Sequence, residues 1–309
     1  MMSDLPRRRR LSYYELYTSL PLFAGIQSSI EEAKYVVVGV PLDITSTFRS
    51  GSRFAPEAIR EASLHIETYN LRNNMDLEDL SIHDLGNLHV NPRIEISLDR
   101  LYKVAEELIG DKKIPVFMGG EHTITLGTTR GSGSDVAIIV FDAHLDLRNE
   151  YLGQRVSHAT FLRRVSEEIN SENILGLGVR AICKEELEYA KKENIDFFTT
   201  QQILMEREKV VDRLSEFLED KERVYLSIDM DVLDPSFAPA VQNPEPNGLS
   251  YRDLLDILQR ICDLRMVAFD LVEVTPPYDH GITAILSANI IFDVICQIEK
   301  SRKNLETKL

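Results

Sequence analysis

The chain has 309 residues, of which 43% are apolar, and its formal net charge is −15 at pH 7. A chain of this length and apolar content can bury a sizeable core, either in one large domain or in two smaller ones. The negative electrostatic field of this net charge excludes nucleic-acid binding that is driven by net charge. The same field would attract a small cationic molecule. We therefore expect no nucleic-acid partner.

The longest run of consecutive basic residues in the chain is Arg7 to Arg10. We interpret this run as a solvated arm or as an arm that packs against another subunit. The three cysteines are far apart and form no C-x-x-C motif, which predicts reduced thiols in a cytoplasmic protein. We expect no membrane span, because no stretch reads as long and apolar enough, and no signal peptide, because no apolar core follows the basic residues.

Short apolar runs recur along the chain and predict strands. Most of these runs are apolar at consecutive positions, which is the pattern of strands that are covered on both faces. The runs are Tyr35 to Val40, Ile114 to Gly119, Val136 to Phe141, Ile174 to Val179, Val224 to Asp229 and Met266 to Val272.

Segments with helical periodicity lie between these runs. Apolar stripes cover residues 98–109, 210–218 and 254–261, and the sequence SYRD at 250–253 predicts a capping box at the start of the third helix. Residues 284–298 are apolar nearly all round, which predicts a buried helix. Strands that alternate with helices predict one parallel α/β sheet with helices on both faces.

The chain shows no internal repeat and no composition shift that would mark a domain boundary. We expect a single domain over residues 1–309, with residues 1–34 as an N-terminal arm and lead-in segment. The longest loops are expected at 70–91 and 234–247. A glycine-rich stretch at 127–135 precedes a strand, whereas a dinucleotide-binding loop follows one, so we interpret this stretch as an ordinary loop.

Acids and imidazoles follow several of the predicted strands, at the sheet edge where α/β proteins bind ligands. In an extended chain alternate side chains point the same way, so the acids and the histidine of DAHLD can converge, as can the two acids of DMD. A histidine also closes the motif GGEH. The candidate metal ligands are His122, Asp142, His144, Asp146, Asp229 and Asp231.

A charge count favours two metal ions in this cluster. Four carboxylates in one pocket repel one another and take up protons unless two divalent cations neutralise them. Oxygen and imidazole ligands without thiolate favour Mn²⁺ over a structural zinc, although Co²⁺, Ni²⁺ or Zn²⁺ could also bind. Two such ions about 3.5–4 Å apart can deprotonate a shared water, and the resulting hydroxide is the nucleophile that a hydrolase needs. The alternative is a set of solvated surface acids, but that does not explain why each motif follows an apolar strand.

The sequence resembles the ureohydrolases, the family of arginases, agmatinases and their relatives. The resemblance rests on GGEHT, FDAHLDLR, SHATFLRR, SIDMDVLDPSFAPA and DLVEVTPPYDHGITA, in this order, and it covers residues 36–298. It implies the three-layer arginase-type α/β fold, with a central, mostly parallel eight-stranded sheet and helices on both faces. It also implies two Mn²⁺ per chain and a homo-oligomer, either a trimer or a hexamer.

The resemblance further implies a role for each site residue. His122 and Asp146 would bind one metal, His144 and Asp231 the other, and Asp142 and Asp229 would bridge them. His158 resembles the histidine that shuttles protons, and Glu273 resembles the carboxylate that holds the guanidinium group. Glu121 is expected to orient His122.

Within the family, the sequence looks like the agmatinase branch. Arginases follow D-x-H-x-D with small polar residues that grip an amino acid, whereas Arg148, Asn149 and Glu150 stand here. The implied reaction is attack of a metal-bridging hydroxide on agmatine, a small cationic guanidino substrate, to give putrescine and urea. Asp43, Glu150 and Glu245 are acids that could attract the distal ammonium.

Three alternatives stay open. An N1-aminopropylagmatine ureohydrolase would need a longer acidic tunnel, and a guanidinobutyrase would use Arg148 or Arg180 for a distal carboxylate. A protein of another class, a metal-binding sensor, would keep the fold without turnover.

Overall fold

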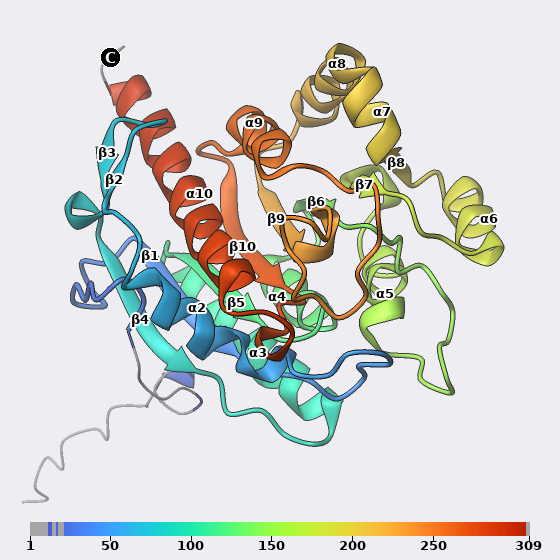
Figure 1. Cartoon of the computed structure of the whole chain (residues 1–309), viewed down its shortest axis with the longest axis horizontal. Coiled ribbons are helices and arrows are strands. Elements are labelled where there is room, and N and C mark those ends of the chain that lie inside the picture. The colour runs from blue at the N-terminus through green and yellow to red at the C-terminus, as the bar shows by residue number, and fades with distance from the viewer. Residues whose placement is uncertain (1–11, 14–16, 18–21, 307–309) are drawn as a thin grey trace, which may run out of the picture.

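The computed structural model describes residues 12, 13, 17 and 22–306 of the chain. The basic run at positions 7–10 lies outside these residues, so its expected role stays a prediction. The chain folds into one large sheet between two layers of helices (Figure 1).

The large sheet has eight strands, and every neighbouring pair is parallel. Its order is β4 (Ile82–Asn87), β1 (Tyr35–Val40), β5 (Ile114–Gly119), β10 (Met266–Val272), β9 (Val224–Asp229), β6 (Ala137–Phe141), β7 (Ile174–Val179) and β8 (Asp196–Thr199). A two-stranded antiparallel sheet joins β2 (Tyr69–Asn70) and β3 (Met75–Asp76). The prediction of an eight-stranded parallel sheet is confirmed.

Helices cover both faces of the large sheet. One apolar core joins it to α2 (Ala55–Ser63), α8 (Arg207–Leu218), α9 (Tyr251–Ile261) and α10 (Ile282–Glu306). A second core joins its other face to α3 (Ile94–Gly110), α4 (Ile124–Ser132), α5 (Phe161–Ser166) and α6 (Lys184–Glu193). The short helix α7 (Thr200–Met205) follows β8. Alternate residues of β1 enter different cores, since Tyr35 and Val37 face the first core and Val36 and Val38 the second.

The sequence predicted the inner strands well and the outer ones poorly. Five predicted runs match strands to the residue, and the sixth begins one residue later, at Ala137. The expected loop at 70–91 is wrong, because it contains the last residue of β2 and all of β3 and β4, and β8 was not predicted. Ser250 caps α9 through the predicted capping box.

The interpretation of residues 127–135 as a loop is wrong for residues 127–132, which belong to α4, and holds for residues 133–135. The glycines allow α3 and α4 to pack closely. A Cβ atom on Gly131 would lie 2.5 Å from the Cβ of Ala105, and one on Gly127 would lie 3.1 Å from the carbonyl oxygen of Leu98. The glycines are therefore packing residues within a helix, where each costs about 1 kcal/mol of helix propensity relative to alanine.

The expectation that no segment is long and apolar enough to span a membrane is wrong on length and composition. Residues 282–305 of α10 meet both criteria, because they contain an 18-residue window with a mean hydropathy of 1.6. However, 67% of this window is buried inside the protein, where α10 packs against the sheet and α9. The apolar character of α10 is thus accounted for by its place in the core.

Candidate metal centre and active site

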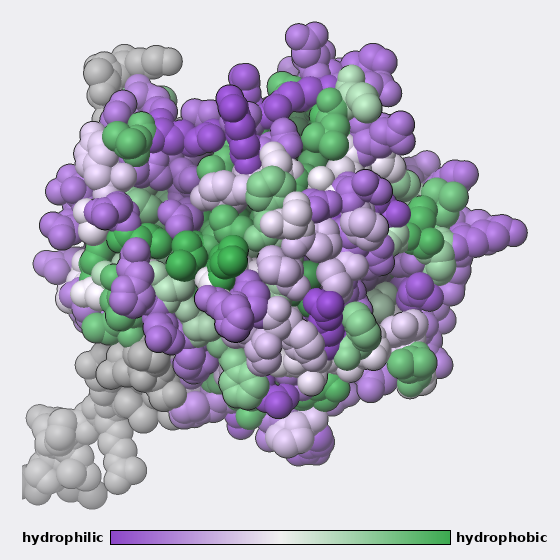
Figure 2. All heavy atoms as spheres, viewed as in Figure 1, coloured by the Kyte–Doolittle hydropathy of each residue, from purple (hydrophilic) through white to green (hydrophobic). Residues whose placement is uncertain are grey.

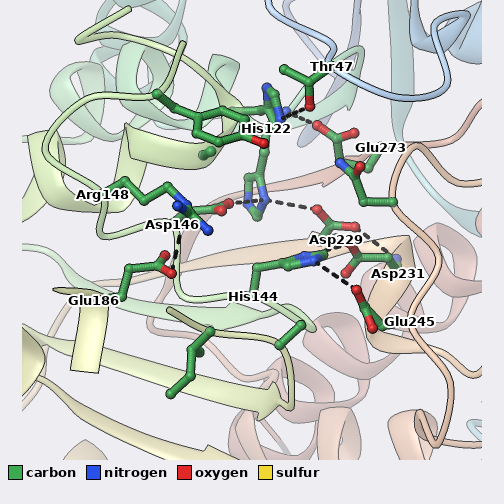
Figure 3. A pocket seen from close by; sticks show the side chains of 16 residues that line it. Thr47, His122, His144, Asp146, Arg148, Glu186, Asp229, Asp231, Glu245 and Glu273 are labelled. Atoms are coloured by element: carbon green, nitrogen blue, oxygen red, sulfur yellow. Dashed lines mark hydrogen bonds and ion pairs between the residues drawn. The ribbon is translucent and has the colours of Figure 1, made fainter. Parts of the chain in front are cut away.

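The strand order brings four carboxyl ends side by side, those of β5, β10, β9 and β6. His122 follows β5, Asp142 follows β6, Asp229 ends β9, and Glu273 follows β10. These ends belong to neighbouring strands although they are far apart in sequence. Figure 3 shows three of these side chains, those of His122, Asp229 and Glu273, around one cavity.

Two groups of side chains could each hold a metal ion, and both contain Asp142. The first group is His122, Asp142 and Asp229, and the second is Asp142, His144 and Asp231. Within each group the ligand atoms lie within 4.8 Å of one another. A shared carboxylate is the arrangement expected where two ions lie close together.

The distances from the imidazoles of His122 and His144 to the surrounding carboxylates show how Asp142 is shared between the two groups. His122 Nδ1 lies 3.1 Å from Asp142 Oδ2, 3.0 Å from Asp229 Oδ2 and 3.7 Å from Asp146 Oδ2. His144 Nδ1 lies 3.0 Å from Asp231 Oδ2 and 3.4 Å from Asp142 Oδ1. Asp142 therefore turns one carboxylate oxygen toward each imidazole.

The hydrogen bonds of His122 fit a metal ligand. Its Nδ1 is buried and makes no hydrogen bond of normal geometry to the described residues, although three carboxylate oxygens surround it. Its Nε2 lies 2.9 Å from Ser227 Oγ, which in turn donates to Asp270 Oδ1 at 2.6 Å. A metal-binding histidine commonly uses its second nitrogen in this way, which fixes the orientation of the ring.

Without cations, several groups of the cluster favour their protonated forms, although for Asp142 burial is outweighed by the nearby imidazoles of His122 and His144, which lower its pKa. Burial raises the pKa of Asp229, and the neighbouring charges of Asp231 and Asp142 raise it further. Burial and Asp142 likewise raise the pKa of Asp146. Burial lowers the pKa of His122, but the nearby carboxylates of Asp142 and Asp229 outweigh burial and raise it well above 6.5. Cations bound between these groups would replace the protons.

Glu273 lies beside the first ligand group with one oxygen free. Its Oε1 accepts a hydrogen bond from the backbone nitrogen of His122 at 2.5 Å. Its Oε2 is buried and has no hydrogen-bond partner among the described residues. Burial, together with the charge of Asp229, raises the pKa of Glu273 well above its ordinary value. An unpaired buried carboxylate oxygen is ready to receive a cationic donor.

The loop after β6 departs from the expected geometry at Asp146. Simple alternation along an extended chain predicted that the side chains of DAHLD converge, and they do. However, Asp146 has a φ of 50°, so the backbone leaves the extended conformation there. Glu273, with a φ of 67°, is also left-handed. Such conformations cost about 1–3 kcal/mol each and are concentrated at functional sites.

The expected role of Glu121 in orienting His122 is wrong. Its carboxylate accepts hydrogen bonds from Thr123 and from the 44–45 loop, and it makes none to the imidazole of His122. The residue that hydrogen-bonds to Nε2 of this ring is Ser227, which the sequence did not predict, and Phe161 stacks on the ring with the two ring centres 4.0 Å apart. The sequence does contain an indication of this role. Ser227 is a polar residue within an apolar strand, and it lies two residues before Asp229 and therefore on the same side of the strand.

The cavity above the cluster has a volume of about 330 Å³. Seven of the eight predicted site residues line it, namely His122, His144, Asp146, His158, Asp229, Asp231 and Glu273, while Asp142 contacts both imidazoles. His158 is buried, and burial together with His144 and His122 lowers its pKa to about 4. The cavity therefore opens onto a neutral imidazole opposite the carboxylates.

Of the three acids expected near a distal ammonium, only Glu245 lines the cavity. Asp43 is held internally by Ser46, Arg53 and the backbone nitrogen of Gly51. Glu150 is exposed outside the cavity. The carboxylate of Glu245 lies 3.9 Å from His144 Nε2 and is 37% exposed.

The two arginines considered for a distal carboxylate differ in their surroundings. Arg180 lies within hydrogen-bond distance of six backbone carbonyl oxygens and is not among the residues that line the cavity. Arg148 does line the cavity, with its guanidinium 4.9 Å from the ring centre of Tyr151 and 3.9 Å from Glu186. Only Arg148 remains as a candidate partner for an anionic substrate end.

The fold and the site define a class of protein, a three-layer α/β domain with paired metal-ligand groups at the carboxyl edge of its sheet. A comparison with family models matches the arginase family over residues 33–296. The chain belongs to the arginase family.

Individual relatives support this assignment. The agmatinase of Halalkalibacterium halodurans is 36% identical over 266 residues, which cover 84% of this chain and 89% of that protein. The N(1)-aminopropylagmatine ureohydrolase of Thermococcus kodakarensis is 35% identical over 85% of this chain and 90% of its own length. The crystal structure of agmatine ureohydrolase of Thermoplasma volcanium is similar with a TM-score of 0.84, at 36% identity, over 90% of this chain and 94% of that one.

Proposed function

We propose that this protein hydrolyses agmatine to putrescine and urea with two divalent cations, Mn²⁺ in the first instance. The observation that carries the proposal is the free carboxylate oxygen of Glu273, which is buried beside the two metal-ligand groups. A guanidinium bound there would place its carbon next to the groups that hold the cations. Agmatinases among the relatives support this choice of substrate.

Each side chain of the site has a task in this proposal. His122 and Asp146 would hold one cation, His144 and Asp231 would hold the other, and Asp142 and Asp229 would contribute to both. When bound, the cations would supply a nucleophilic hydroxide from water near neutral pH.

Glu273 would bind the substrate head group. Its Oε2 can accept the N–H donors of a planar guanidinium, and hydrogen bonds between ions of opposite charge are about twice as strong as neutral ones. Because Oε1 is already bonded to the backbone of His122, the carboxylate is held in one orientation. The guanidinium would thus be fixed relative to the first ligand group.

His158 would move protons. It is neutral at working pH because its pKa is lowered to about 4, so it has a nitrogen free to accept a proton. Hydrolysis adds the oxygen of water to the guanidinium carbon and a proton to the departing amine. His158 lines the same cavity as Glu273 and can carry that proton.

Glu245 supports agmatine over an anionic guanidino compound, because a distal ammonium would meet its carboxylate in the cavity. Arg148 favours an anionic substrate instead, because the guanidinium of Arg148 could bind the distal carboxylate of 4-guanidinobutyrate, as in a guanidinobutyrase. N1-aminopropylagmatine would also match an acidic end, and the relative from Thermococcus kodakarensis carries that activity in its name. We place agmatine first because Arg148 is already stacked on Tyr151 and close to Glu186.

The decisive test is urea release by the Mn²⁺-loaded protein from agmatine, N1-aminopropylagmatine, 4-guanidinobutyrate and arginine. We expect the highest kcat/KM for agmatine. Arginine should be at least about a hundredfold poorer, because its carboxylate would be desolvated without a partner, and each 1.4 kcal/mol is tenfold in rate. Equal kcat/KM for arginine and agmatine would refute the substrate assignment. Failure to release urea from all four compounds would favour the metal-binding sensor.

A further inference from the structure

Glu121 is a buried carboxylate with four hydrogen-bond donors around it. Its Oε2 accepts from the backbone nitrogens of Ile44 and Thr45, both at 2.7 Å. Its Oε1 accepts from Thr45 Oγ1 at 2.9 Å and from Thr123 Oγ1 at 2.8 Å. None of these contacts reaches a residue of the two metal-ligand groups, so they serve something other than holding a ligand.

Thr45 connects this carboxylate to His158. The backbone nitrogen of His158 donates to Thr45 Oγ1 at 3.1 Å, and the ring nitrogen Nδ1 lies at the same distance from that oxygen. The other ring nitrogen, Nε2, lies 3.5 Å from Thr47 Oγ1, and both His158 and Thr47 line the cavity. The ring is therefore held at Nδ1 and presents Nε2 to the cavity.

Counting hydroxyl protons fixes the direction of the bond at Nδ1. Thr45 has a single hydroxyl proton, and its bond to the Glu121 carboxylate at 2.9 Å takes that proton. Thr123 cannot supply another, because its own proton goes to the same carboxylate oxygen. Thr45 Oγ1 is left with its two lone pairs, which accept from the backbone N–H and the ring Nδ1–H of His158.

We propose that Glu121 and Thr45 act as positioning residues that lock neutral His158 in the tautomer with a proton on Nδ1 and a lone pair on Nε2. The nitrogen that faces the cavity is then always the one that can accept a proton. In the proposed hydrolysis, Nε2 would take the proton released from water and return it to the nitrogen of the departing amine as the C–N bond breaks. The opposite tautomer would present an N–H there and could not accept that proton.

The inference on catalysis rests on the proposed function, whereas the tautomer can be measured without any substrate. The test is nitrogen NMR of the full chain with ¹⁵N-labelled histidine, loaded with diamagnetic Zn²⁺ at neutral pH. The signals of His158 are assigned by comparison with His158→Gln among the seven histidines of the chain. We expect Nδ1 to be protonated in the wild type.

Three variants separate positioning from a merely structural role. Thr45→Val keeps the shape of the side chain but removes the acceptor, so the Nε2–H form should become dominant and kcat should fall about tenfold or more at unchanged KM. Thr45→Ser should restore both the tautomer and kcat. Thr123→Val is the matched control, because it removes the other hydroxyl bond to Glu121 without a contact to His158, and it should keep the Nδ1–H form.

Two results would overturn the proposal. One is an Nε2–H signal for His158 in the wild type, and the other is an unchanged Nδ1–H tautomer in Thr45→Val. If the tautomer behaves as expected but no guanidino compound is hydrolysed, the proposed function fails while the positioning of His158 stands.

Discussion

Asp229 lies between the two ligand groups in our proposal, and it carries one of the charges that offset the cations. In Asp229→Asn the carboxylate is replaced by a neutral amide of similar shape, so at least one of the two ions should be lost. The measurement is the metal content per chain after dialysis against metal-free buffer. A variant that still retains two tightly held ions would show that Asp229 does not bridge them.

Glu245 is the acid best placed to bind the distal ammonium of agmatine. We expect Glu245→Gln to lower kcat/KM for agmatine by about tenfold, since a hydrogen bond between charged groups contributes about 1.5–3 kcal/mol and exposure weakens it. The value for 4-guanidinobutyrate, which has no distal ammonium, should change less. Glu150→Gln is the control, because Glu150 is exposed outside the cavity. If Glu245→Gln affects both substrates equally, the ammonium binds elsewhere.

Glu273 should matter to every guanidino substrate, because it would bind their common head group. Glu273→Gln keeps the side-chain size but removes the charge, so kcat/KM should fall by a similar factor for agmatine and 4-guanidinobutyrate. Steady-state urea release with each substrate measures this. A loss confined to one substrate would place Glu273 near its distal end instead.

For individual residues, the sequence predicted which side chains lie together in the site but not which neighbours they hydrogen-bond to. Seven of the eight candidate residues end a strand or lie within a few residues of its carboxyl end, whereas His158 begins a short 3-10 helix well after β6 and was predicted from the family resemblance. The motifs did not predict that Ser227, rather than Glu121, hydrogen-bonds to the ring of His122, because hydrogen-bond partners depend on the register between strands. Nor did they separate Glu245 from Asp43, since internal pairing to Arg53 is not visible in the sequence.

Helix α4 shows how a glycine can be required inside an element. In Gly131→Ala the new methyl group would meet the backbone nitrogen of Glu106 and the carbonyl oxygen of Tyr102, each 2.8 Å away. Overpacking of this kind costs about 1–3 kcal/mol of unfolding free energy. Urea unfolding should show this as a lower midpoint at an unchanged slope.

Gly110 provides the control for this prediction. It ends α3, and a Cβ atom there would meet nothing within 4 Å. Gly110→Ala should therefore leave stability unchanged or raise it by up to about 1 kcal/mol. If Gly131→Ala is as stable as Gly110→Ala, α3 and α4 do not need the close contact.

The elements that the sequence did not predict are those whose pattern is ambiguous. The inner strands are buried on both faces and read as continuous apolar runs. The edge strands β4 and β8 carry polar residues, as IHDLGN and DFFT show, because one side of each has no strand partner. For α4, the glycines suggested a loop because their contacts with α3 are tertiary.

For the whole molecule, metal binding and stability should be linked through pH. The pKa values of Asp146, Asp229 and Glu273 are raised in the folded state, and so are those of His122 and His144. The lowered pKa values of Asp142 and His158 act in the opposite direction, but they are fewer. A raised folded-state pKa contributes stability that is present below the unfolded pKa and is lost as the pH rises through the folded value. The metal-free protein should thus lose stability from about pH 4 upward.

Cations should offset this loss, because they bind the deprotonated ligands and stabilise only the folded state. We expect the rise in Tm on adding Mn²⁺ to be larger at pH 8 than at pH 6, as measured by calorimetry with EDTA-treated protein as the reference. A rise that is equal at both values, or larger at pH 6, would contradict the coupling.

The surface is consistent with the expected homo-oligomer, a trimer or hexamer, which stays a prediction. Figure 2 shows apolar side chains among polar ones along the exposed face of α10, and Ile282 and Ile285 at its start are 57% and 43% exposed. Apolar side chains left exposed in this way can be covered by a second subunit. Light scattering should give a multiple of the 35.2 kDa chain mass. A monomer mass at working concentrations would exclude the oligomer.

The position of β10 in the sheet has a consequence for synthesis on the ribosome. This strand lies between β5 and β9, although it is made last of the eight. Until residues 266–272 have emerged, β5 and β9 each present an unpaired edge, and open edges invite pairing with other chains. At about 5–20 residues per second, the edge of β5 stays open for on the order of 10 s. The nascent chain therefore completes both its sheet and its active site in one late step, when β10 inserts and brings Glu273 with it.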